Sequence, residues 1–142
     1  MSTKREQILA AIAATLAGTT GVGTRVYRSR QEAFSRQEAP AIIIEPGPDN
    51  PGQEPVSTCK IDWTLNVSIA VYARGNVPDQ AADTVVLSLH SKLLADRTLG
   101  GLVMDIWPGG VDPQFDKGDL ATVWMVCTYI IRYRTSVTDL SI

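Results

Sequence analysis

The clearest hydrophobic pattern in this chain is an almost unbroken alternation of apolar and polar residues over positions 59–73. A period of two is typical of a β-strand with one face in the core. The apolar positions are Cys59, Ile61, Trp63, Leu65, Val67, Ile69 and Val71. Extended chain of this length would measure about 50 Å, well beyond the usual strand. We therefore expect part of this strand to project or bend away from the body of the protein.

A second alternating segment covers residues 121–135. Its odd positions, from Val123 to Tyr133, are apolar and can join the same core. Its even positions include Trp124, Val126 and Ile130. An antiparallel sheet with helices on one face would leave these three side chains in water. Either the helices cover both faces or another subunit covers the second one. We favour the subunit, because an exposed apolar patch containing Trp is typical of an interface.

Two segments have the spacing of amphipathic helices. The first begins at a Thr3–Glu6 capping box and ends at Gly18, with apolar residues at Leu9, Ile12 and Leu16. The second begins with Pro78 at its first position and ends before the glycines at 100 and 101. Its apolar stripe consists of Ala82, Val85, Val86, Leu89 and Leu93.

The remaining segments are shorter. Residues 25–29 and 41–44 have the composition of strands, and a short helical or turn segment separates them. Residues 47–58 are rich in proline and glycine, which predicts a loop. Residues 102–107 lead into a predicted turn at 108–113 and an acidic loop at 114–119. Together these elements indicate a single α/β (α+β) domain over residues 1–142.

Composition excludes several classes of protein. The chain has 142 residues, of which 44% are hydrophobic and 20% charged, and its net charge is −2. These are ordinary globular values, and the weak negative charge disfavours a nucleic-acid binder. We find neither a signal peptide nor the roughly 18 consecutive apolar residues of a membrane span, and expect a cytosolic chain with no membrane partner. We expect both cysteines, Cys59 and Cys127, to be buried thiols.

The sequence GTTGVG at residues 18–23 suggests a phosphate-binding loop, but its context is wrong. Such a loop follows a strand and precedes a helix, whose free N–H groups bind the phosphate. Here the glycines follow a helix and precede a strand. We therefore expect a helix stop and a tight turn.

No combination of residues predicts catalysis. We expect the only histidine, His90, to lie in or beside the core, because no second histidine or patterned nucleophile accompanies it. The acids Asp112, Asp116 and Asp119 lack the ligand pattern of a calcium loop. We expect no catalytic, cofactor-binding or metal-binding residues, and no enzyme.

Charged residues supply the candidate contacts. The basic cluster is Arg25, Arg28, Arg30 and Arg36, and acids follow it at Glu45, Asp49 and Glu54. Acidic residues dilute the cluster and few aromatic residues accompany it, so nucleic-acid binding is disfavoured. Pairing between these arginines and the acids of a neighbouring copy is a coherent alternative.

The order and the amino-acid sequences of several segments resemble those of the tail terminator proteins of long-tailed phages and prophages. These segments are RVYRSRQEAFSRQEAPAIIIEPG at 25–47, the proline-rich acidic loop, VYARG at 71–75, the helix of 81–96 and YIIRYRT at 129–135. The resemblance covers nearly the whole chain. It implies a mixed, mainly antiparallel sheet of about four to five strands, with two main helices packed on one face.

The resemblance also implies a function without catalysis. Such a protein forms a hexameric ring on the last ring of the tail tube, ends tube polymerisation and offers a surface to a head-completion or connector protein. It is assembled in the host bacterial cytoplasm and lies in the virion, at the head-proximal end of the tail. DNA passes through its lumen only as cargo. Replacing Arg28 and Arg30 with glutamate should then abolish the ring and leave the monomer folded.

Three alternatives stay open. The chain could be another head–tail connector or neck protein, or a tail tube subunit. More remotely, it could be a DNA-binding accessory protein, which would show steeply salt-dependent binding to duplex DNA.

Overall fold

The computed structural model describes residues 2–53, 59–117 and 121–142. Its elements in chain order are α1 (Lys4–Leu16), β1 (Val26–Arg28), the 3₁₀ helix η1 (Arg36–Glu38), β2 (Ala41–Pro51), β3 (Lys60–Arg74), α2 (Pro78–Leu94), β4 (Asp105–Lys117) and β5 (Ala121–Ser136). The strands form one five-stranded sheet in the order β1-β2-β3-β5-β4. Only β1 and β2 are parallel.

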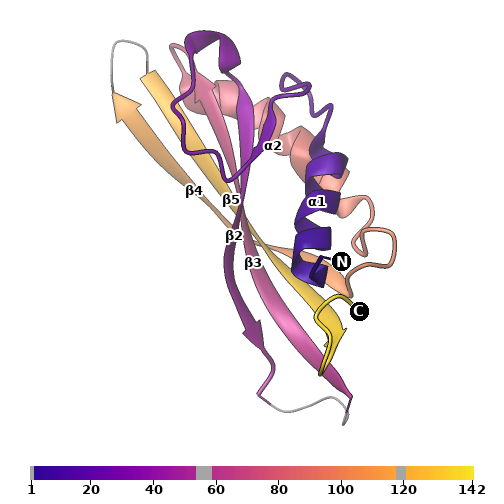
Figure 1. The fold of residues 1–142 in the computed structure, drawn as a ribbon. Helices are drawn as coiled ribbons and strands as arrows, with labels where there is room; N and C mark the ends of the chain where they lie inside the picture. The colour runs from indigo at the N-terminus through magenta and orange to yellow at the C-terminus, as the bar shows by residue number, and fades with distance from the viewer. Residues whose placement is uncertain (1, 54–58, 118–120) are drawn as a thin grey trace.

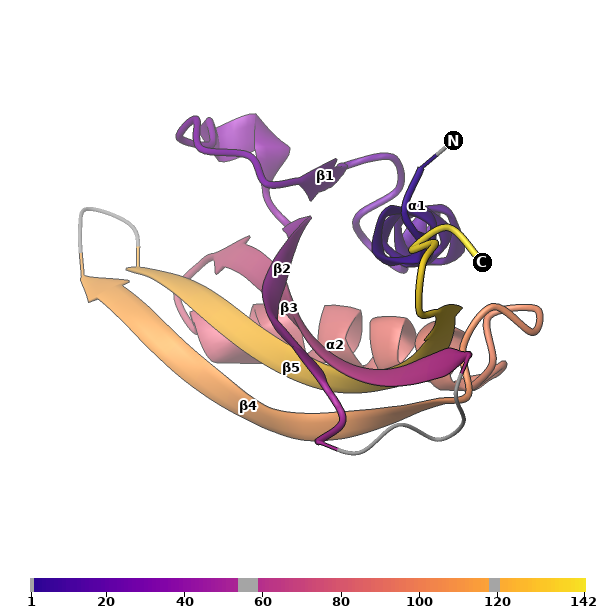
Figure 2. The same ribbon diagram turned by 60° about the horizontal axis from the view of Figure 1, so that its bottom comes forward.

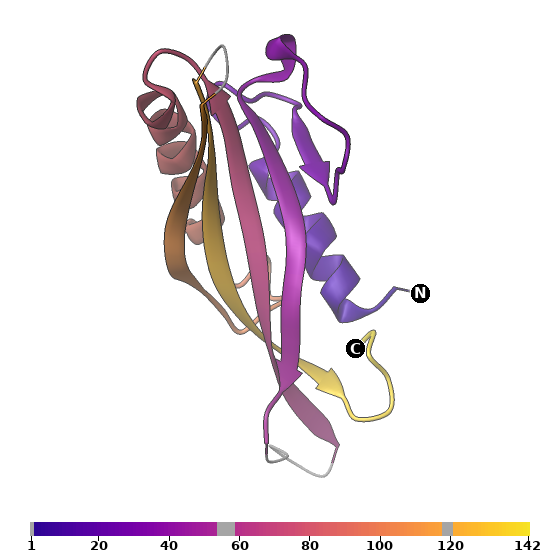
Figure 3. The same ribbon diagram turned by 90° about the vertical axis from the view of Figure 1, so that its left-hand side faces the viewer.

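The fold is the α+β arrangement that the sequence predicts, with a mixed sheet and two helices. Both helices lie on one side of the sheet, and in Figure 3 the strands lie in front of them. We call this side the helix face and the other side the outer face. The sheet is strongly bent (Figure 2). The free ends of β2 and β3 extend past α1 (Figure 1), as the length of the predicted strand suggested.

Local sequence explains where the helices begin and end. The Thr3 side chain accepts a hydrogen bond of 3.2 Å from the Glu6 N–H, which caps α1. Gly18, just beyond the end of α1, has a φ of +83°, which glycine adopts without strain. Pro78 occupies the first turn of α2, where its missing N–H costs nothing.

The core lies between the helices and the helix face. Residues paired across neighbouring strands point to the same face, and β3 pairs with β5 through Leu65–Ile131, Val67–Tyr129 and Ile69–Cys127. These side chains are buried together with the apolar stripes of both helices. The buried helix residues are Ile8, Leu9, Ile12, Leu16, Ala82, Val85, Leu89 and Leu93. The two alternating strands were thus predicted with the correct face inward.

Two predicted loops are strands instead. β2 continues through Pro46 and Pro48 to Pro51, and β4 runs through the PGGVDP segment to Lys117. Both stretches lie at sheet edges, since β1 pairs with β2 only as far as Ile44. Proline is tolerated at an edge, where the hydrogen bond that it cannot donate would face solvent. Each strand also has a register shift, at Pro46/Asp49 and Pro108/Gly110. The rest of the predicted first loop, residues 54–58, lies outside the described residues.

The cysteines and the histidine differ in part from expectation. Cys127 is buried, and burial raises the pKa of its thiol to about 11. Cys59 is exposed, because it stands just before β3 at the projecting end of the sheet, where no helix covers it. The His90 side chain is exposed at the edge of α2, and its Nδ1 lies 2.8 Å from the Tyr129 hydroxyl.

No helix in the described chain has the length and hydropathy to cross a membrane.

Candidate interaction surface

The residues between β1 and β2 fold over one end of the outer face. We call residues 29–40 the outer loop. Its Phe34 ring stacks on Tyr72, with centroids 5.1 Å apart, and lies 5.8 Å from Trp124 and 5.6 Å from Tyr27. The Tyr72 and Trp124 rings are themselves 4.8 Å apart. The chain therefore covers part of its own outer face with a loop. The sequence analysis had considered only helices or another subunit as the cover for Trp124.

Arg30 holds the outer loop in place. Its guanidinium donates two hydrogen bonds, of 2.7 and 3.2 Å, to the Glu38 carboxylate. It also lies 4.6 Å from the Tyr27 ring centroid and 4.3 Å from that of Phe34. Arg30, and next the Ser35 N–H, lower the pKa of Glu38 to about 2. Arg30 is thus paired with an acid inside the chain, while its Nε is buried with no hydrogen-bond partner among the described residues.

Beside the outer loop lies a groove of about 340 Å³ in the outer face. Its floor is mainly apolar and comes from the three central strands, with Ile43, Ala70, Trp124 and Val126 among its lining residues. Gln114 of β4 also lines it. We call this the outer groove. Four of the predicted contact residues meet here, because Arg30 and Glu45 line the outer groove with Trp124 and Val126.

The outer groove carries negative charge from two glutamates. Glu32 and Glu45 both line it and are both exposed. In the part of the chain that the structure describes, neither carboxylate forms an ion pair, whereas Arg30 is paired with Glu38. These carboxylates disfavour an acidic occupant, and the apolar floor favours an apolar one.

Arg25 and Arg28 also have partners within the chain. Arg28 binds the Glu6 carboxylate through two hydrogen bonds of 2.6 and 2.7 Å. Arg25 donates to the carbonyl oxygens of Pro40 and Gly21, at 2.9 and 2.8 Å. Replacing Arg28 and Arg30 with glutamate would therefore disturb the monomer as well as any interface. Arg36 lies in η1, but its side chain is outside the described part of the structure, as is Glu54.

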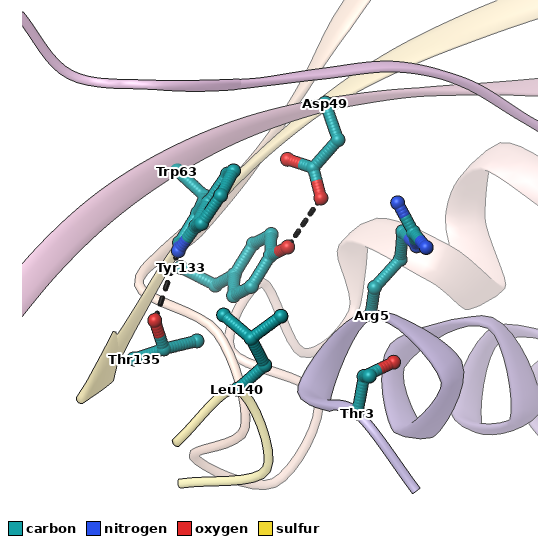
Figure 4. A pocket seen from close by; sticks show the side chains of 7 residues that line it. All are labelled: Thr3, Arg5, Asp49, Trp63, Tyr133, Thr135 and Leu140. Atoms are coloured by element: carbon teal, nitrogen blue, oxygen red, sulfur yellow. Dashed lines mark hydrogen bonds between the residues drawn. The ribbon is translucent and has the colours of Figure 1, made fainter. Parts of the chain in front are cut away.

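Asp49 lies elsewhere, at the projecting end of the sheet. Its Oδ2 accepts a hydrogen bond from the Tyr133 hydroxyl in a cavity of about 40 Å³ (Figure 4). Burial, and next this bond, raise the pKa of Tyr133. Arg5 lines the same cavity, and the Trp63 indole beside it donates to Thr135 Oγ1 at 2.9 Å. Asp49 therefore has one hydrogen-bond partner inside the chain, and its Oδ1 is buried with none among the described residues.

Strand β4 carries a second exposed surface that the sequence reasoning missed. Trp107, Val111 and Phe115 are 57%, 56% and 55% exposed. Trp107 pairs with Ile130 on the outer face, whereas Val111 and Phe115 pair with Cys127 and Val123 on the helix face. The alternation of apolar and polar residues over 111–116 could have revealed this strand, but the surrounding prolines and glycines favoured a turn.

The described residues contain no group of histidine, cysteine and acidic side chains that could hold a metal ion. No protein-family model matches the sequence, and no curated protein matches it. One solved structure with a related arrangement is a chain from the virion of a native gene transfer agent particle. It is 14% identical, the alignment covers 92% of each chain, and the TM-score is 0.49. Similarity at this level does not carry a functional argument.

Proposed function

We propose that this chain is a phage structural protein, a tail terminator that forms a hexameric ring on the end of the tail tube. In this role it stops tube growth, presents a surface to a head-completion or connector protein, and lets DNA pass as cargo. The chain is not an enzyme in this proposal, and it uses no cofactor. The resemblance of its segments to tail terminators suggests this identity.

The observation that carries the proposal is the exposed apolar surface of β4. The core is complete without Trp107, Val111 and Phe115, since the helices already bury the helix face of β3 and β5. Large apolar side chains on a long edge strand invite association, and monomeric proteins usually blunt such edges with charge. A subunit of a permanent assembly has a use for them, because its neighbours cover them.

Arrest of tube growth is the direct test. Tail tube protein from the same phage or prophage would be polymerised with and without this chain, and tube lengths measured by electron microscopy. A terminator added in small amounts should shorten the tubes and stop further elongation. Tubes of unchanged length would contradict the proposal, and tubes built from this chain itself would identify a tube subunit.

A further inference from the structure

The two faces of β4 differ in charge. On the outer face, Asp112 and Asp116 flank Gln114, because these residues pair with Val126, Thr122 and Trp124. On the helix face, Val111, Pro113 and Phe115 carry no charge, and α2 leaves Val111 and Phe115 more than half exposed. We call Val111 and Phe115 the β4 ridge.

Charge decides which face of β4 the outer groove of another copy could accept. Glu32 and Glu45 would repel the acidic outer face of β4, because like charges placed opposite each other in an interface oppose association. The same two carboxylates do not oppose the uncharged β4 ridge, and the apolar floor of the groove favours it. The groove volume of about 340 Å³ is within the range of pockets that hold apolar groups.

Backbone pairing between copies would be a weaker alternative. It would join the free edge of β4 to another open edge, such as β2 beyond Ile44. Pro46, Pro48 and Pro51 interrupt the hydrogen-bond donors of β2 there, and β4 itself contains Pro108 and Pro113. Because proline cannot donate to a ladder, contacts between side chains fit these edges better than strand addition does.

The β4 ridge and the outer groove lie at the same level along the strands. Val111 pairs with Cys127 and Phe115 with Val123. The groove residues Trp124 and Val126 lie between these two partners along β5. The two surfaces face opposite sides of the sheet. A head-to-tail contact between such surfaces need not shift successive copies along the strand direction, and copies related by rotation alone close into a ring.

We infer that the β4 ridge of one copy seats in the outer groove of the next copy, and that this head-to-tail contact builds the ring. The inference rests on the proposed function for the existence of a ring. A 13-residue strand about 44 Å long and about 4.8 Å wide within the sheet offers about 210 Å² in projection. That is about a quarter of the roughly 800 Å² per partner of a standard interface, so a single junction is weak and ring closure reinforces it.

Replacing Phe115 with either an acidic or a basic residue tests the contact, because a negatively charged groove should oppose the first and tolerate the second. Phe115→Asp should weaken self-association by at least about tenfold, because the new carboxylate meets an acidic groove. Phe115→Lys, which removes the same ring, should associate better than Phe115→Asp. Adding Glu45→Lys to Phe115→Asp should restore part of the lost association. Self-association would be measured by analytical ultracentrifugation, with circular dichroism as the check on folding.

Crosslinking tests the same contact without relying on affinity. In a Cys59→Ser background, Val111→Cys and Ser68→Cys would be combined in one chain and treated with a short bismaleimide at high protein concentration. Ser68 lines the groove, and β5 separates it from β4 within one chain. The double variant should give a ladder of covalent oligomers, and a mixture of the two single variants should give dimers only.

The matched control replaces Val111→Cys with Leu87→Cys, since Leu87 of α2 is an apolar side chain with 68% exposure. It should give no ladder. The inference is overturned if the control crosslinks as well as the test pair, or if Phe115→Asp and Phe115→Lys associate equally. It is also overturned if the wild-type chain stays monomeric and the double variant gives no ladder. Tubes still shortened by the chain would then leave the terminator function standing with a different ring contact.

Discussion

Ile131 and Ile130 are neighbours on β5 with opposite surroundings. Ile131 is fully buried on the helix face, between the sheet and the helices, whereas Ile130 is only half-buried on the outer face. The same contrast holds along the strand, where Cys127 is 1% exposed but Val126 lines an open groove. The helix face of the central strands therefore supplies most of the stability of the monomer, and the part of the outer face that the outer loop leaves uncovered remains available for contacts.

The largest effect should follow from truncation on the helix face. Ile131→Ala removes a side chain with no exposed surface and should lower the free energy of unfolding by about 2–5 kcal/mol. Ile130→Ala, at the next position, should cost about 1 kcal/mol or less because Ile130 is only half-buried. Urea denaturation of both variants would measure the difference. Equal losses would mean that the two faces do not differ as described.

The outer loop should show an intermediate effect. Phe34→Ala removes contacts with Tyr72, Trp124 and Tyr27 and should cost about 1–2 kcal/mol, because the ring is only partly buried. The loop should also become more sensitive to trypsin at Arg30 and Arg36. Limited proteolysis followed by mass spectrometry would locate the cleavage. An unchanged cleavage rate would show that Phe34 does not hold the loop.

The pairing of Arg30 with Glu38 should make the outer loop sensitive to acid. The pKa of Glu38 is about 2 in the folded chain against an ordinary value of 4.5. Because the folded pKa is the lower one, this contribution is complete above about pH 4.5 and is lost as the pH falls toward 2. Arg30→Gln should return the pKa of Glu38 toward 4.5. An NMR titration of the Glu38 carboxyl in both proteins measures this, and identical titrations would contradict the pairing.

The smallest effect on the monomer should come from β4. Val111→Ser and Phe115→Ser should each change the free energy of unfolding by less than about 0.5 kcal/mol, since both side chains are more than half exposed. Thermal denaturation of dilute protein would measure this. A large loss would show that these side chains stabilise the monomer, and would remove the main reason to assign them to assembly.

The contrast between β3 and β4 shows what the sequence can predict. β3 is a central strand with regular alternation, and the predicted residues 59–73 differ little from the observed Lys60–Arg74. β4 contains two prolines and two glycines, which indicate a turn by local propensity. Pairing along β5 overrides that propensity at the edge of the sheet. Local signals therefore predicted the central strands and the edge strand β1, and failed at the edge stretches of β2 and β4 that contain proline.

The outer groove could not be predicted for a related reason. Its residues come from the outer loop and from four strands, and only the register of those strands brings Glu45 and Trp124 to one place. The cover over Trp124 depends on Phe34, some 90 positions earlier in the chain. Alternation along β5 correctly identified a face that needs covering, but it could not name the residue that covers it.

Cryo-electron microscopy of tubes grown in the presence of this chain tests the central claim most directly. We expect one six-fold ring of the chain at one end of each tube, with Phe115 of every copy seated against Trp124 and Val126 of its neighbour. Tubes with no ring, or with the chain distributed along their length, would contradict the terminator function. A terminal ring whose subunits meet through other surfaces would contradict the proposed contact.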